Sequence, residues 1–157
     1  MKRTVQAEII SPLLILIGIA CVVLRVVCIW HLGVFADEFG RFSWSAFYGG
    51  GLWYTADMAC LVLLVLLTVG GALLPRMRAL KPVLFLFSLL VLALTVKLRY
   101  SNSLYAAQID TPLWEVFGGP GLFSLVVIEL VLLLAYCVLA AVGWLAGGEA
   151  AGAPSLS

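Results

Sequence analysis

Charged side chains are scarce in this sequence. They account for 11% of its 157 residues, while 64% of the residues are hydrophobic. A soluble globular domain has about 25% charged and about 45–50% apolar residues, so a chain of this composition is predicted to lie mostly in lipid. The net charge is +1 and no long basic run is present, so we expect no interaction with nucleic acid.

Residues that bind metals or carry out catalysis are equally few. One histidine is present, and the four cysteines lie inside apolar runs without forming a Cys-x-x-Cys pair. We therefore expect neither a disulfide framework nor a tetrahedral zinc site. The sequence also lacks a glycine-rich phosphate loop, an HExxH motif, a nucleophile elbow and an EF-hand loop. We predict no cofactor, no metal and no catalytic residue, which favours a protein that is not an enzyme. The cysteines are Cys21, Cys28, Cys60 and Cys137.

What the chain does contain is long apolar runs. A helix of about 20 apolar residues spans the hydrocarbon core of a bilayer. The runs predict an all-α integral membrane protein, a four-transmembrane-helix up-down bundle with short interfacial helices in the two outer loops. One transmembrane domain would cover residues 1–145, and the small residues of 146–157 predict a flexible C-terminal tail. The predicted spans lie near residues 11–32, 51–74, 82–100 and 121–145.

The first span has a recognisable start. Ser11 followed by Pro12 is typical of a hydroxyl cap and a proline at the first helical position. A basic start before an apolar run also resembles a signal peptide. However, the run continues well past Cys21, which favours an uncleaved membrane helix.

The two longer loops also carry helical signals. Within residues 34–48 the aromatic side chains Phe35, Phe39 and Phe42 recur at helical spacing, with charged residues largely on the other side. This pattern predicts a short amphipathic helix lying in the membrane interface. In the second loop, Thr111 and Pro112 indicate one or two helical turns that reach Phe117.

The distribution of basic residues predicts the orientation. The termini and the short loop between the second and third spans hold most of the lysine and arginine residues outside the spans: Lys2, Arg3, Arg76, Arg78 and Lys81. Basic residues favour the cytoplasmic side. We therefore predict cytoplasmic termini, in a protein of the bacterial plasma (inner) membrane.

Aromatic residues gather on the opposite, outer side. They are interpreted as an interfacial anchoring belt. The alternative is that some of them line a pocket, and the candidate pocket rim is His31, Trp53, Tyr54, Tyr100 and Trp114.

Four ionisable residues fall within the apolar spans, namely Arg25, Asp57, Lys97 and Glu129. Counted from the outer ends of the spans, their depths are roughly 10, 9, 5 and 12 Å. All four therefore fall in the outer half of the bilayer and form a candidate polar site. A charge that faces lipid at such depth costs at least about 2.5–3.5 kcal/mol, so we expect ion pairs.

The helix order suggests which charges pair. In an up-down bundle the second span adjoins the third, and the fourth returns beside the first. The simplest pairs are Asp57 with Lys97 and Arg25 with Glu129, while Arg25 with Asp57 is an alternative. Lys97 is also shallow enough to extend to the interface without a partner.

Three functions stay open. The first is a non-catalytic component or accessory subunit of a larger membrane complex, in contact with another membrane protein or with further copies of itself. The second is a small enzyme or binding protein for a lipid or quinone at the outer leaflet. The third is an oligomeric transporter or ion-conducting protein. The charged residues are a structural set of ion pairs in the first case and a functional polar cavity in the others.

Overall fold

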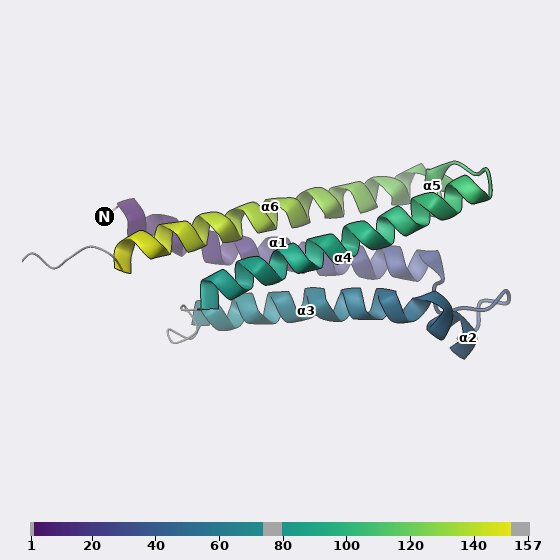
Figure 1. Cartoon of the computed structure of the whole chain (residues 1–157), viewed down its shortest axis with the longest axis horizontal. Coiled ribbons are helices and arrows are strands. Elements are labelled where there is room, and N and C mark those ends of the chain that lie inside the picture. Colours follow the sequence, from purple (N-terminus) through teal and green to yellow (C-terminus); the bar gives the residue numbers. More distant parts are fainter. Residues whose placement is uncertain (1, 74–79, 152–157) are drawn as a thin grey trace, which may run out of the picture.

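The chain folds into a bundle of long helices. The computed structural model describes residues 2–73 and 80–151. The regular elements of the described residues are helices, and these residues include one isolated β-bridge but no strand, which confirms the all-α prediction. In chain order the elements are α1 (Lys2–Leu32), α2 (Trp44–Ala46), the π-helix η1 (Phe47–Gly51), α3 (Leu52–Leu73), α4 (Lys81–Gln108), α5 (Leu113–Val116) and α6 (Pro120–Ala151) (Figure 1).

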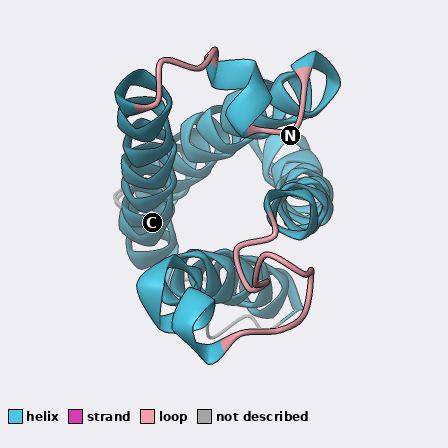
Figure 2. Cartoon of the chain, turned by 90° about the vertical axis from the view of Figure 1, so that its right-hand side faces the viewer, coloured by secondary structure: helices cyan, strands magenta, loops and turns pink. Residues whose placement is uncertain are grey.

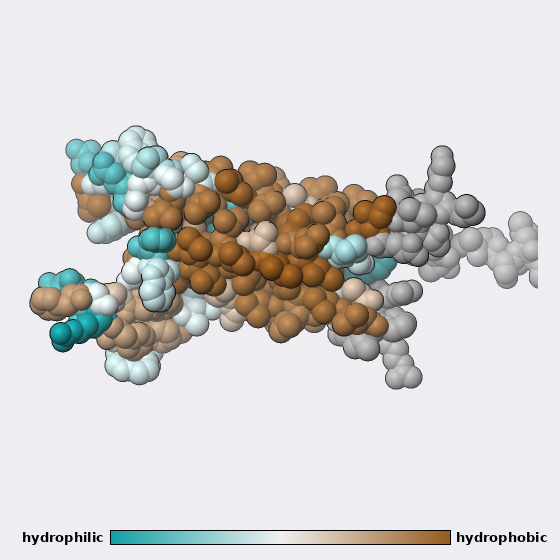
Figure 3. Space-filling view, turned by 180° about the vertical axis from the view of Figure 1, so that it is seen from behind, coloured by the Kyte–Doolittle hydropathy of each residue, from teal (hydrophilic) through white to brown (hydrophobic). Residues whose placement is uncertain are grey.

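Four helical segments of the described residues are long and apolar enough to cross a membrane, as predicted. Their bounds are Ile9–Leu32, Trp44–Leu73, Lys81–Gln108 and Pro120–Leu145. The hydrophobic surface covers the middle of the molecule, and paler, hydrophilic residues gather at the end that carries the loops (Figure 3). Large apolar side chains such as Leu16, Leu66 and Leu86 lie exposed on this surface, which suits contact with lipid chains rather than water.

The four long helices surround a common axis. Helix α1 packs against α3 and α6, and α4 packs against the same two helices. The start of α1 and the end of α6 lie at one end of the bundle, and α2 and α5 lie at the other (Figures 1 and 2). Every long helix therefore presents one side to the interior and another to the surroundings.

The interior is built from two apolar clusters. The larger cluster includes Leu14, Cys21, Leu61, Leu64, Val91, Leu133, Tyr136 and Ala140, and the smaller one consists of Cys28, Phe117 and Val126. Along α1, Arg25 lies between Cys21 and Cys28, which belong to different clusters. Along α6, Glu129 lies between Val126 and Leu133 in the same way. The buried charges therefore form a layer between the two apolar clusters.

Three long helices extend beyond the apolar runs from which their ends were predicted. Helix α1 begins at Lys2, so the predicted start at Ser11 is wrong and Pro12 lies inside the helix. A proline inside a helix removes one backbone hydrogen bond and crowds the preceding turn, and membrane helices accommodate both effects. Helix α4 continues past Tyr100 to Gln108, because its polar end contains no helix breaker before Asp110, which has φ 51°, and Pro112.

Helix α6 also outlasts its apolar run. It reaches Ala151, within the segment predicted as the tail, and residues 152–157 lie outside the described part of the chain. The basic connection that contains Arg76 and Arg78 lies outside it as well.

The first loop is not the amphipathic helix that the phenylalanine spacing predicted. Helical structure begins only at Trp44, and the preceding segment is a turn closed by a bridge between Ala36 and Phe42. The Asp37 carboxylate accepts hydrogen bonds from the backbone N–H groups of Phe39 and Arg41, at 2.9 and 2.8 Å. Such aspartate bonds compete with helix formation, and Gly40 adds a left-handed turn at φ 74°.

The π-helix η1 packs closely against this loop, and a substitution can test that contact. A Cβ atom added at Gly51 would lie 2.9 Å from the backbone oxygen of Val34 and 2.7 Å from the Phe35 ring, whereas one added at Gly50 would have nothing within 4 Å. We expect Gly51→Ala to lower the free energy of unfolding by about 1–3 kcal/mol, the usual cost of overpacking. Gly50→Ala is the matched control and should not destabilise. Thermal unfolding of both variants in detergent gives the comparison, and equal melting temperatures would contradict it.

Candidate functional site

The buried charges converge on Arg25 of α1, which is completely inaccessible to solvent. Its Nε donates to Oε1 of Glu129 on α6 at 2.5 Å, and its Nη2 forms an ion pair with the same oxygen. Its Nη1 lies 2.8 Å from Oδ2 of Asp57 on α3. Its Nη2 also donates to Oγ1 of Thr95 on α4 at 2.9 Å. One guanidinium group therefore contacts side chains of all three other long helices.

Thr95 connects the guanidinium to the second carboxylate. Its hydroxyl accepts from Arg25 and lies 3.0 Å from Oδ1 of Asp57 and 2.9 Å from the Val91 carbonyl oxygen. The single hydroxyl proton can serve either acceptor. Both Asp57 oxygens therefore have polar neighbours, although the side chain is only 2% exposed.

Glu129 is paired through both of its oxygens. Oε1 faces Arg25, and Oε2 lies 3.0 Å from Nη2 of Arg99 on α4. The guanidinium of Arg99 also lies over the Phe117 ring, with 5.7 Å between its Cζ and the ring centroid. The charge layer therefore consists of Arg25, Asp57, Arg99 and Glu129, with two positive and two negative charges.

The predicted pair of Arg25 with Glu129 is present, as is the alternative pair of Arg25 with Asp57. The predicted pair of Asp57 with Lys97 is wrong. Lys97 is exposed, and its Nζ lies 5.3 Å from the centroid of the Trp53 ring. Positions 97 and 99 differ by about 200° around a helix. With Arg99 turned inward, Lys97 must face outward.

Sequence reasoning therefore missed Thr95 and Arg99. A signal for both was present in the spacing of small and polar residues along the third span. Ser88, Val91, Thr95, Arg99 and Ala106 are the buried residues of α4, and they recur at intervals of three, four and seven. That spacing follows one side of a helix.

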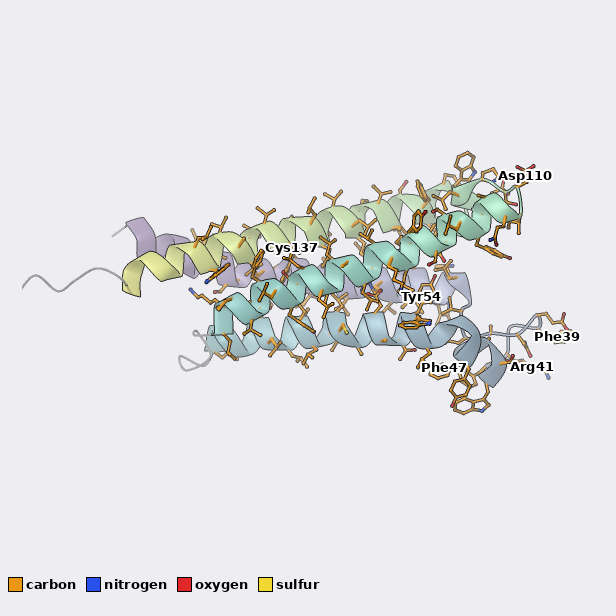
Figure 4. The ribbon with its side chains drawn as sticks, in the orientation of Figure 1. Phe39, Arg41, Phe47, Tyr54, Asp110 and Cys137 are labelled. Atoms are coloured by element: carbon orange, nitrogen blue, oxygen red, sulfur yellow. The ribbon has the colours of Figure 1, made fainter. Side chains whose placement is uncertain are left out.

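The candidate rim residues do not come together. The Tyr54 side chain lies between α3 and α4 (Figure 4). Its hydroxyl donates to Oδ1 of Asn102 on α4 at 2.8 Å. The remaining four, His31, Trp53, Tyr100 and Trp114, are exposed on the outside of the bundle. An exposed position suits the anchoring belt better than the rim of a pocket.

Within the charge layer, each carboxylate is paired with at least one arginine. Both carboxylates are paired, their side chains are at most 2% exposed, and the formal charges balance. The searched residues contain no group of three or more histidine, cysteine, aspartate or glutamate side chains that could hold a metal ion. Comparison of the chain with known protein families, with characterised proteins and with solved structures gives no match. The interpretation therefore depends on this geometry.

Removing the central cation should be far more harmful than removing the exposed one. We expect Arg25→Met to lower the free energy of unfolding by about 3–5 kcal/mol, because it leaves Asp57 without a cation and Glu129 with only Arg99. Lys97→Met is the matched control, since it removes the same charge from an exposed position, and it should stay within about 0.5 kcal/mol of the native chain. Reversible unfolding in mixed micelles measures both. Similar losses in the two variants would show that the buried network is not the stabilising element.

A second substitution separates a stranded charge from a simple packing defect. Adding Asp57→Asn to Arg25→Met removes one unpaired carboxylate, so the double variant should regain part of the lost stability. The single variant Asp57→Asn is measured as well. If the loss of stability in the double variant equals the sum of the losses in Arg25→Met and Asp57→Asn, the cost of Arg25→Met comes from lost packing instead.

Proposed function

We propose that this chain is a non-catalytic integral membrane protein that works as a component of a larger membrane complex. The observation that carries the proposal is the pairing of both buried carboxylates with arginine side chains. Asp57 and Glu129 are the acid or base candidates within the spans, and both are buried in ion pairs. A group that takes or gives a proton must reach the reacting atoms, and these carboxylates face arginine residues instead.

The ion pairs suit a role in assembly. Arg25 joins α1 to the other three long helices through short polar contacts. In a low dielectric such contacts are costly to break, and buried polar groups of this kind can specify helix order and register. A small bundle with a specified helix arrangement is a suitable rigid subunit.

The proposed topology has four transmembrane spans in up-down order, with both termini in the cytoplasm. The basic residues of the N-terminus and the short connection support this orientation. The short helices α2 and α5 would then lie at the outer interface. Exposed aromatic residues around α2, such as Phe42, Trp44 and Tyr48, support that placement, because aromatic rings favour the headgroup region.

The other two functions have less support. A transporter needs a polar path through the membrane, whereas the larger cluster of the bundle is apolar, and the hydroxyl of its Tyr136 bonds to the hydroxyl of the buried Thr68. An enzyme at the outer leaflet would need a free acid or base, and the charge layer holds none among the described residues. Binding of a lipid or quinone without catalysis stays compatible with the accessory role.

Extraction under native conditions tests the accessory role. When the membrane is solubilised with an amphipathic copolymer that keeps the surrounding lipid, we expect the chain to elute with a second membrane protein or as a defined oligomer. A stable, monodisperse particle that contains one copy of the chain alone would overturn the proposal. Mass photometry of the eluted particle, combined with peptide mass spectrometry, distinguishes these results.

Cysteine accessibility tests the topology. Ser101 lies near the outer end of α4 and is exposed, while Leu80, also exposed, lies just before its first residue. With a membrane-impermeant maleimide on intact cells, Ser101→Cys should label and Leu80→Cys should label only after permeabilisation. The unsubstituted chain is the control, since Cys21, Cys28 and Cys137 are buried and Cys60 packs against the larger apolar cluster. Labelling of Leu80→Cys alone in intact cells would invert the proposed orientation.

A further inference from the structure

Arg99 holds donors that its surroundings do not use. Its side chain is 9% exposed, and one of its nitrogen atoms, Nη2, bonds to Glu129. The other two, Nε and Nη1, are buried and have no hydrogen-bond partner in the described part of the chain. An unsatisfied buried donor costs about 1–3 kcal/mol, so a guanidinium held in this way favours binding of an additional acceptor.

Asn102, about one turn further along α4, also has a buried nitrogen without a hydrogen-bond partner in the described part of the chain. Residues three apart lie on the same side of a helix, so the Arg99 and Asn102 side chains are neighbours. The Tyr54 hydroxyl donates to the Asn102 Oδ1 atom. The Asn102 Nδ2 atom is buried and, within the described residues, has no partner. Two neighbouring side chains thus present unused N–H groups.

These donors lie near the end of the bundle that carries the loops. Tyr54 belongs to the first turn of α3, and Asn102 belongs to the last two turns of α4. Figure 3 shows this end divided into two lobes with a notch between them. Phe117 covers the Arg99 guanidinium from the second loop. It is followed by Gly118 and Gly119, whose positive φ angles of 81° and 117° mark a sharp change of chain direction.

The charge balance indicates what kind of acceptor fits. Arg25 and Arg99 are already balanced by Asp57 and Glu129. A bound anion would leave the buried layer with a net negative charge, which is costly in a low dielectric. An uncharged carbonyl oxygen accepts hydrogen bonds without this cost.

We propose that Arg99 and Asn102 form a binding site for the carbonyl oxygen of an uncharged amphiphile. The ligand enters from the loop-bearing end when the Phe117 ring moves aside, and it accepts hydrogen bonds from the unused donors. Two membrane molecules without net charge supply such an oxygen, namely a zwitterionic phospholipid through its ester group and a quinone through its ring. The proposal does not depend on the accessory role, because a structural subunit can hold a bound amphiphile.

The test uses the full chain and separates the two sources. In nanodiscs of a diether phosphatidylcholine, which has no carbonyl group, decylubiquinone is titrated and binding is followed by quenching of tryptophan fluorescence. In a parallel experiment, native mass spectrometry compares retention of diester and diether phosphatidylcholine. Binding in the first experiment identifies a quinone-type ring, and selective retention of the diester lipid identifies the ester group.

Three variants connect binding to the site. Arg99→Lys keeps the charge but removes the Nε and Nη1 donors, and Asn102→Ala removes the amide. Each should weaken binding about tenfold, the effect of losing a hydrogen bond to a buried partner. Lys97→Gln is the matched control on the exposed side of the same helix and should change affinity less than about twofold.

Several results would overturn the proposal. Failure of both carbonyl probes to bind the native chain is one, and unchanged affinity in Arg99→Lys and Asn102→Ala is another. Selective retention of a diether phosphatidylglycerol, which is anionic and has no carbonyl group, would show an anion site instead. If Arg99→Lys fails to fold, Asn102→Ala decides the matter, because Asn102 takes no part in the ion pairs.

Discussion

The rest of this structure depends on one guanidinium group. Arg25 reaches from α1 to Asp57 on α3, to Thr95 on α4 and to Glu129 on α6, and it is completely buried. Helices inside a bilayer gain little from hydrophobic contact with one another, because lipid chains are equally apolar. Polar contacts and close packing then decide which helices meet and in which register. A single side chain that contacts three other helices constrains both.

The layer also explains the division of the core. An apolar cluster lies on each side of the charges, and the larger one extends from Leu14 and Ala140 to Cys21 and Leu133. Apolar surroundings raise the cost of an unpaired charge and strengthen each ion pair. The carboxylates therefore need the arginines as much as the helices need the contacts. That mutual dependence favours a structural role for Asp57 and Glu129 over acid–base chemistry.

Toward the loop-bearing end the pairing becomes incomplete. Arg99 satisfies Glu129 with one nitrogen, and its other two nitrogens and the Asn102 amide nitrogen are buried without partners in the described part of the chain. The contrast with Arg25 is informative, because the two arginines contact the same carboxylate. Arg25 uses its guanidinium to connect the four long helices. Arg99 lies closer to the loop-bearing end, and in our proposal its unused donors bind an amphiphile, so that assembly and ligand binding would occupy different parts of one network.

The sequence by itself predicted the membrane class and the number of long apolar helices, and it named Glu129 and Asp57 as the two candidate partners of Arg25. Hydropathy and depth are properties of the chain's linear order, and a charge deep in lipid must find a partner at similar depth. The rotation of each helix was decided only by the tertiary structure. Lys97 and Arg99 are two residues apart and nearly equal in depth, yet Arg99 packs inside and Lys97 faces outward. The first loop was decided in the same way, since the Asp37 carboxylate binds the backbone that the phenylalanine spacing predicted to be helical. Such outcomes depend on which side of a helix its neighbours cover and on bonds that form only when the chain turns, and neither is visible in residue spacing alone.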